Sequence, residues 1–187
     1  SCTLKDPGDI SADDKAGPVW KSQADLAVTM SVYVSNFHHQ RMASAQKQLL
    51  DGWNNDKRLP KDFPVTVLRD AQLDQTFMKR FNAAIQADAQ KDIIQGYIES
   101  GGTKTLSKFS ANVVQTAEAD PTFLAKYNTY VQQMKDTSVR LDVTVGQLID
   151  LQALGNDKGK QQTKYREIQF QNAQTNETAV SQAHKIM

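Results

Sequence analysis

The spacing of apolar residues along the chain predicts helices rather than strands. After Ser22, a good helix N-cap, apolar positions recur at intervals of three, four and eight residues, which places them in one stripe on a helix over about residues 23–52. Gly52, the polar residues 54–58 and Pro60 are expected to end this helix, because a prolyl ring cannot follow the next turn. The stripe consists of Leu26, Met30, Tyr33, Phe37, Ala45, Leu49 and Trp53.

Two segments further along the chain match each other. Residues 63–86 and 109–132 align without gaps at an offset of 46, with eight identical pairs. Shared helical periodicity would preserve apolar pairs but would not require the same Asp, Thr, Asn and Gln at polar positions. The sequence therefore predicts a tandem duplication of one unit, in which a helix, a tight corner and a second helix follow one another. The identical pairs are Phe63/Phe109, Val67/Val113, Ala71/Ala117, Asp74/Asp120, Thr76/Thr122, Phe77/Phe123, Asn82/Asn128 and Gln86/Gln132.

Each copy is expected to contain a short helix and then a long one. Residues 65–68 are rich in β-branched side chains and could form a strand, but their counterparts 111–114 fit one face of a helix. Both segments are therefore predicted to be helical. The expected N-caps are Asp62 and Ser107 for the short helices, and Asp74 and Asp120 for the long ones.

The two long helices are predicted to end at glycines. Gly101 and Gly102 supply the left-handed backbone that ends the first helix. The second is expected to run from Phe123 through Leu148 and to stop at Gly155. Residues 158–187 are rich in Gln, Asn and Thr and carry a thin apolar seam, so a last, loosely packed helix is expected there.

These elements predict an all-α helical bundle with a tandem duplicated helix-corner-helix unit. Residues 1–21 hold two prolines, two glycines and several aspartates, a composition that breaks helices and buries little surface. The sequence therefore predicts a flexible N-terminal tether over residues 1–21 and a single helical domain over residues 22–187.

Charge and hydropathy argue against a nucleic-acid partner and against a membrane-spanning helix. The 22 basic residues are balanced by 21 acidic ones, so the net charge of +1 provides no general field that would hold a phosphate backbone. Nucleic acid is therefore not an expected partner. The mean hydropathy is -0.57, and no apolar run approaches the roughly 20 residues that span a bilayer.

The chain has one cysteine, Cys2, followed by a polar stretch. If Ser1 is a residue left by removal of a tag, the natural chain starts at this cysteine, and it then resembles a mature bacterial lipoprotein. That resemblance implies a lipid on Cys2, and Thr3 in place of Asp implies sorting to the outer membrane, on its periplasmic side. The alternative is a surface cysteine near the end of the chain.

No group of residues predicts catalysis, and no cofactor is expected. His38 and His39 are adjacent, so they point about 100° apart on a helix, and neither has a second metal-ligating residue three or four positions away. His38 shares a side with Val34 and Met42, which would suit an axial haem ligand, but a histidine at the edge of a core has the same neighbours. No metal site and no enzymatic activity are predicted.

A polar strip is the candidate partner-binding site. Asn82 and Gln86 on one predicted helix, and Asn128 and Gln132 on its counterpart, stand at positions i and i+4. They could form a recognition strip for a partner, or hydrogen-bonded pairs between helices inherited by both copies.

The leading functional hypothesis is a non-catalytic interaction or scaffold lipoprotein, tethered to the membrane through Cys2, that binds a protein partner and supports an envelope complex. One alternative is a periplasmic carrier or sensor of haem or an apolar small molecule near His38 and Met42. A third hypothesis is an immunity-type inhibitor of a toxic effector.

Overall fold

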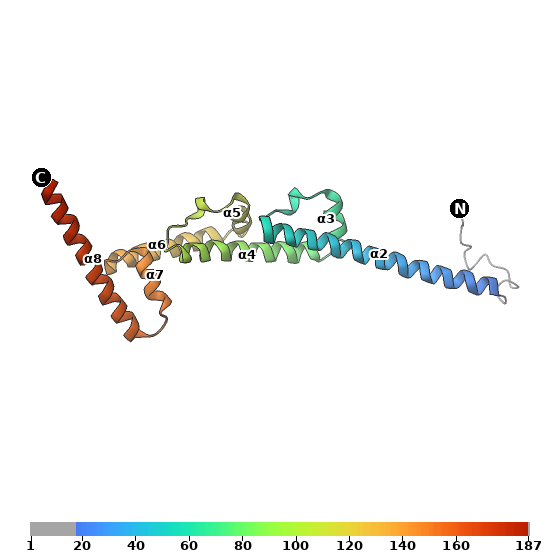
Figure 1. The fold of residues 1–187 in the computed structure, drawn as a ribbon. Coiled ribbons are helices and arrows are strands. Elements are labelled where there is room, and N and C mark those ends of the chain that lie inside the picture. The colour runs from blue at the N-terminus through green and yellow to red at the C-terminus, as the bar shows by residue number, and fades with distance from the viewer. Residues whose placement is uncertain (1–17, 187) are drawn as a thin grey trace. The chain divides into compact units, whose positions relative to one another are not determined.

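The computed structural model describes residues 18–186, with side chains described from Asp25 onward except for that of Ala27. Within this range the chain forms seven α-helices and no strand, which confirms the all-α fold class (Figure 1). None of these helices combines the length and the apolar character needed to cross a bilayer. The chain divides into two compact units, residues 1–81 and 82–187, with the boundary inside one helix. The sequence predicted a single domain over residues 22–187. Because the structure divides into two units, each unit is described by itself.

The first unit is built on α2 (Pro18–Asp56) and α3 (Val65–Ala71), which pack against each other. The 3-10 turn η2 (Pro60–Asp62) joins them, and residues 77–81 of α4 (Phe77–Glu99) complete the unit. Because α2 begins at Pro18, the tether prediction was wrong for residues 18–21, which are helical; proline is well tolerated at a first helical position. The rest of the predicted tether, residues 1–17, lies outside the described residues. The buried apolar residues are Ala45, Leu49, Trp53, Leu59, Phe63, Ala71, Phe77 and Phe81.

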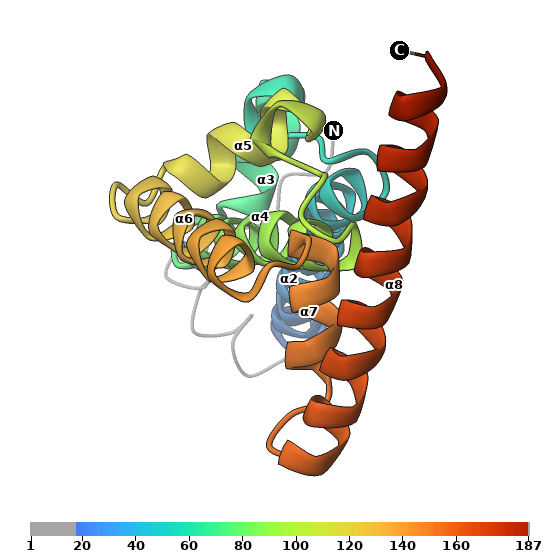
Figure 2. The same cartoon turned by 90° about the vertical axis from the view of Figure 1, so that its left-hand side faces the viewer.

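The second unit contains the rest of α4 and four further α-helices. They are α5 (Ala111–Glu118), α6 (Phe123–Leu141), α7 (Val145–Ala153) and α8 (Lys158–Ile186), with the 3-10 turn η3 (Leu106–Lys108) before α5. Figure 2 shows α7 lying along α8. One core cluster consists of Tyr97, Met134, Leu148 and Ile149, and Ile168 is the buried residue that α8 contributes. The other buried apolar residues of this unit are Ile85, Ala89, Ile93, Val113, Ala117, Phe123, Tyr127 and Leu151. The last helix is thus present and packs through a thin seam.

The prediction of one helix from Phe123 to Gly155 was wrong, because the chain breaks after Leu141. Asp142 takes a left-handed conformation with φ 55° and ends α6. Thr144 then starts α7 through a capping box, in which its hydroxyl accepts from the Gln147 amide and the Gln147 side chain accepts from Thr144 N–H. The Thr-x-x-Gln pattern is the sequence signal of this second start.

The short helices α3 and α5 confirm the helical prediction for residues 65–68 and 111–114, but their predicted N-caps were wrong. Asp62 and Ser107 lie in the 3-10 turns η2 and η3 instead. The cap positions belong to Pro64 and Ser110, and the Ser110 hydroxyl accepts from Val113 N–H at 3.3 Å. Each 3-10 turn adds residues that an apolar pattern cannot reveal.

The predicted end of the first long helix is confirmed. The last residue of α4 is Glu99, and Gly101 and Gly102 have φ 65° and 85°. The Gly102 amide donates to the Tyr97 carbonyl at 2.8 Å, so the left-handed turn satisfies a carbonyl that the helix leaves open.

The hydroxyl of Tyr97 is buried without a hydrogen-bond partner in the part of the chain that is described. Its ring forms T-shaped pairs with Tyr127 and Tyr130, with distances between ring centres of 6.3 Å and 5.9 Å, so the apolar part of the side chain is well packed. Burial raises the pKa of Tyr97 above its ordinary value, because the charged phenolate is disfavoured there.

Tyr97→Phe is therefore expected to leave the free energy of unfolding unchanged or to raise it by up to about 1 kcal/mol, since it removes an unpaired buried hydroxyl. A raised folded-state pKa also means that stability falls as the pH rises above about 10, and this fall should be smaller in the variant. Urea denaturation at pH 7 and pH 10.5 measures both effects. Tyr165→Phe is the matched control: its hydroxyl donates to the Leu141 carbonyl at 2.9 Å, so about 1 kcal/mol should be lost.

Candidate interaction surfaces

Two segments, which we call the first corner (residues 52–76) and the second corner (residues 96–122), carry the same contacts. In the first unit, Gln46 Nε2 of α2 donates to the carbonyl of Ala71 at the end of α3, at 3.3 Å. In the second, Gln90 Nε2 of α4 donates to the carbonyl of Ala117 near the end of α5, at 3.2 Å. A glutamine of each long helix thus secures the short helix that follows it.

A glycine, a phenylalanine and a basic residue form the same stack in both corners. A Cβ atom on Gly52 would lie 2.4 Å from the Phe63 ring, and one on Gly96 would lie 2.6 Å from the Phe109 ring. The Phe63 ring is covered by Arg58, 4.1 Å from the ring centre, and the Phe109 ring by Lys104, 4.3 Å from the ring centre. The ring can reach the helix backbone only because the residue beneath it is glycine.

Both corners end in an aspartate that turns the chain into the next long helix. Asp74 Oδ1 accepts from the Thr76 amide at 3.0 Å and its hydroxyl at 2.9 Å, and Asp120 Oδ1 accepts from Thr122 in the same way. The backbone and hydroxyl hydrogen bonds from these threonines hold the pKa of both aspartates below the ordinary value. The two aspartates lie three residues before Phe77 and Phe123, where α4 and α6 begin. The prediction of Asp120 as an N-cap was wrong, because the N-cap position of α6 belongs to Thr122.

The match between the two units extends further upstream than the sequence comparison reached. Residues 45–53 read AQKQLLDGW and residues 89–97 read AQKDIIQGY, at an offset of 44. Between these segments and the corner phenylalanines the second unit has two extra residues, because Trp53 precedes Phe63 by ten positions and Tyr97 precedes Phe109 by twelve. An alignment without gaps therefore stops at Phe63 and misses this part.

Three helices carry a pair of aromatic residues four positions apart, and only one of the pairs is exposed. Phe77 and Phe81 on α4 are 7% and 3% exposed, and Phe123 and Tyr127 on α6 are 6% and 4% exposed. The corresponding pair on α2 is Tyr33 and Phe37, which are 66% and 48% exposed. The pair on α2 is thus the one left without cover.

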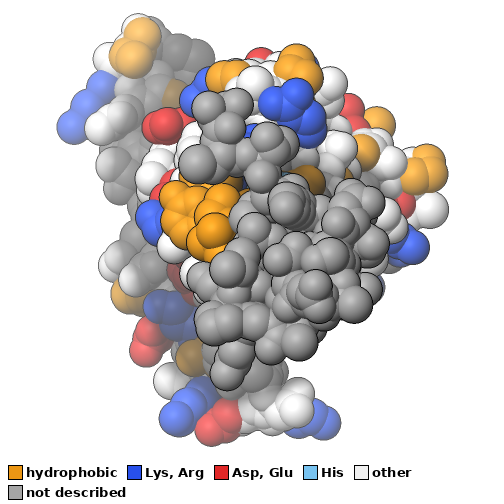
Figure 3. Space-filling view, turned by 90° about the vertical axis from the view of Figure 1, so that its right-hand side faces the viewer, with side chains coloured by type: hydrophobic (Ala, Val, Ile, Leu, Met, Phe, Trp, Pro, Cys, Tyr) orange, Lys and Arg blue, Asp and Glu red, His pale blue; other side chains and the backbone are white. Residues whose placement is uncertain are grey.

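Tyr33 and Phe37 belong to a larger exposed face, the α2 apolar surface, formed with Leu26 and Met30. These four side chains follow at spacings of four, three and four, so they lie in one row on the helix. No Asp, Glu, Lys or Arg occurs between residues 26 and 40. Arg41, over the Phe37 ring at 5.7 Å and paired with Asp70 at 2.7 Å, marks its end. Figure 3 shows hydrophobic side chains gathered on the face in view.

The predicted polar strip is largely at the surface. Asn82, Asn128 and Gln132 are exposed and Gln86 is half-buried. Gln132 Nε2 donates to Asp136 Oδ1 at 2.8 Å, one turn further along α6. The strip remains a prediction, since its side chains are accessible but no contact identifies a partner.

The surroundings of His38 do not form an enclosed ligand site. His38 and Met42 line a hollow of about 450 Å³ with Leu73 of the first corner, and both histidines are exposed. A haem group would require cover on both faces of its ring. Among the described residues no group of three or more His, Cys, Asp or Glu side chains could hold a metal ion.

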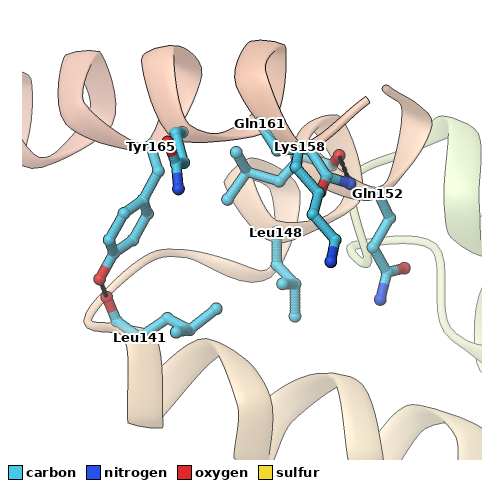
Figure 4. Close-up of a pocket in the computed structure, with 8 residues that line it drawn as sticks. Leu141, Leu148, Gln152, Lys158, Gln161 and Tyr165 are labelled. Carbon is cyan, nitrogen blue, oxygen red and sulfur yellow. Dashed lines mark hydrogen bonds between the residues drawn. The ribbon is translucent and has the colours of Figure 1, made fainter. Parts of the chain in front are cut away.

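A second pocket, of about 460 Å³, lies between the end of α6, α7 and the start of α8 (Figure 4). Its floor is apolar and includes Leu141 and Leu148. Two side chains of α8 hold this helix against its neighbours. The Tyr165 hydroxyl donates to the Leu141 carbonyl, and Gln161 Nε2 donates to the Leu151 and Gly155 carbonyls. The pocket could hold an aliphatic chain, with the ammonium group of Lys158 near an anionic end.

No family model, curated protein or solved structure matches this all-α chain. Cys2, the predicted site of lipid attachment, lies outside the described residues.

Proposed function

We propose that the chain is a non-catalytic helical interaction protein, tethered to the periplasmic side of the bacterial outer membrane by a lipid on Cys2. It binds a protein partner through the α2 apolar surface and supports an envelope complex. The observation that carries this proposal is the exposed row of Leu26, Met30, Tyr33 and Phe37 on a helix segment that lacks charged residues. A face of this kind marks an interaction site, because exposing it to water is unfavourable.

The two corners support a tandem duplication. Eight identical pairs in sequence coincide with the same glutamine bond, the same ring stack and the same aspartate turn in both units. Polar contacts of this detail exceed what two amphipathic helices share by convergence. In proteins built from repeated units each unit buries its apolar face against a neighbour, so an apolar face that is exposed on one unit is a candidate binding surface.

The chemistry of the α2 apolar surface favours a protein over a lipid bilayer as its partner. Helices that lie in a membrane interface carry Lys and Arg along their polar face, and residues 26–40 contain neither. Spacings of four, three and four are those of a seam between helices. A lipid on Cys2 would bring this face close to the membrane without inserting it.

A photo-crosslinking experiment tests the proposal. With a benzoylphenylalanine at position 37 in the native host, we expect an adduct with one protein after illumination, since this side chain belongs to the α2 apolar surface and is 48% exposed. The same residue at position 139, where Val139 is 80% exposed on α6, is the matched control and should give no such adduct.

Cys2→Ser tests the tether in the same cells. The variant should move from the membrane fraction to the soluble fraction and reduce the yield of the adduct, and mass spectrometry of the unaltered chain should find a lipid on Cys2. A position-37 probe that captures no protein, or captures lipid alone, would refute the binding function. Membrane association that survives Cys2→Ser would refute the anchor.

A further inference from the structure

The sequence match between segments of the chain indicates which element covers the aromatic pair of each long helix. Extending the offset of 44 upstream aligns Tyr33 and Phe37 of α2 with Phe77 and Phe81 of α4. An offset of 46 aligns the latter two with Phe123 and Tyr127 of α6. The three pairs thus hold equivalent positions on successive long helices, and two of them are buried.

The cover comes from the second half of the preceding long helix. In the second unit, Tyr97 near the end of α4 packs edge-on against Tyr127 of α6, with ring centres 6.3 Å apart. In the first unit, Trp53 near the end of α2 holds the position equivalent to Tyr97, and it is buried together with Phe81. In the second unit the start of one long helix therefore packs against the end of the one before, and the first unit buries the residues at the equivalent positions.

The covering half-helix has a defined chemistry. It presents a small residue, an aliphatic residue one turn later, and an aromatic residue after a further turn, preceded by glycine. All of these apolar side chains are at most 3% exposed. In α2 they are Ala45, Leu49 and Trp53, and in α4 they are Ala89, Ile93 and Tyr97.

The described part of the chain uses each of its covering segments internally. Those of α2 and α4 are buried in their own units. The end of α6 does not repeat the pattern, because the positions equivalent to Ala89 and Ile93 hold Lys135 and Val139, which are exposed. Folded copies of this chain therefore have no free segment of this kind to place on each other. The α2 apolar surface has no such helix before it in residues 18–186.

We infer that the α2 apolar surface is the docking site for an amphipathic helix of a partner protein, one that carries the small, aliphatic and glycine-aromatic sequence of residues 89–97 on one face. The inference rests on the proposed function and specifies its partner. The partner helix takes the position that α4 takes toward Tyr127. It meets an uncharged face, so its own contact side is uncharged as well.

A helical peptide with the sequence of residues 86–99 tests this chemistry. A hydrocarbon staple at positions 91 and 95 holds it helical and lies opposite the face of Ala89, Ile93 and Tyr97. Added to the full chain in a fluorescence anisotropy titration, it should bind with a Kd in the micromolar range. The same stapled peptide with Ile93→Asp should bind at least tenfold more weakly, because a carboxylate would enter the apolar contact.

Two variants of the full chain locate the site. Phe37→Ser should weaken binding of the stapled peptide at least tenfold, while Val139→Ser, a change at another exposed apolar residue, should change it less than twofold. Both positions are exposed, so the fold is retained, and circular dichroism checks this. Equal binding by the two peptides, no effect of Phe37→Ser, or a dimer of the chain that Phe37→Ser dissolves would each overturn the inference.

The peptide result and the crosslinking result are separable. If the probe at position 37 captures a protein in cells and the stapled peptide does not compete with it, the partner binds by other chemistry and only the present inference fails. If the probe captures no protein, the proposed function fails as well.

Discussion

Replacing Gly102 by alanine is expected to lower the free energy of unfolding by about 2–4 kcal/mol. Gly102 has φ 85°, a left-handed conformation that costs a side-chain-bearing residue about 1–2 kcal/mol. An added Cβ would also lie 2.5 Å from Val145 Cγ1 and 3.2 Å from the Tyr97 hydroxyl oxygen. Crowding of this kind in a packed core costs about 1–3 kcal/mol more. Urea denaturation measures the difference.

Gly155→Ala separates the two causes. Gly155 also has a left-handed backbone, with φ 67°, but no atom lies within 4 Å of an added Cβ. Its substitution should therefore cost only the conformational part, about 1–2 kcal/mol. Equal losses for the two variants would show that Val145 and Tyr97 do not crowd position 102.

Replacing the glycine that contacts each corner phenylalanine is expected to lower the free energy of unfolding by an amount that depends on how tightly the phenylalanine ring is packed. Gly52→Ala should cost about 1–3 kcal/mol, since Phe63 is only 9% exposed and Arg58 packs over its ring. Gly96→Ala should cost less, because Phe109 is half-buried and can move, and because alanine favours a helix interior by about 1 kcal/mol.

Gly159→Ala is the control for helix preference alone. Gly159 is exposed in the first turn of α8, where the nearest atom to an added Cβ is a carboxylate oxygen of Asp157 at 3.5 Å, an ordinary contact distance. This variant should gain up to about 1 kcal/mol. Thermal unfolding of the three variants ranks them, and a gain at Gly52 equal to that at Gly159 would contradict the close approach of Phe63.

The helical class and most element positions were predictable, because the spacing of apolar residues and the residues that end helices indicate the same elements. The apolar spacing places α2, α3, α4 and α5, and the glycine pair at 101 and 102 ends α4 where expected. The break between α6 and α7 was missed, because the apolar positions of residues 123–148 keep a helical spacing across it. The signal lay in polar residues, where Asp142 adopts a left-handed turn and Thr144 pairs with Gln147.

The candidate surface was predictable only in part. The row from Leu26 to Phe37 was visible as a stripe, but a stripe predicts burial, and the sequence offers no sign that this half of α2 lies beyond its covering helices. Likewise, Gln46 and Gln90 could not be assigned as bonded to short helices, because the bonds join residues more than twenty positions apart. Such pairing follows from tertiary packing.

Because two corners of the chain carry the same contacts, the residues of one can be compared directly with those of the other. Gln46 and Gln90 make the same bond, yet only the second also reaches an aspartate, Asp120, at 3.2 Å. Similarly, arginine covers one ring where lysine covers the other. The two corners therefore show that the same bend forms with arginine or with lysine over the ring, and with or without an aspartate as a second acceptor for the glutamine.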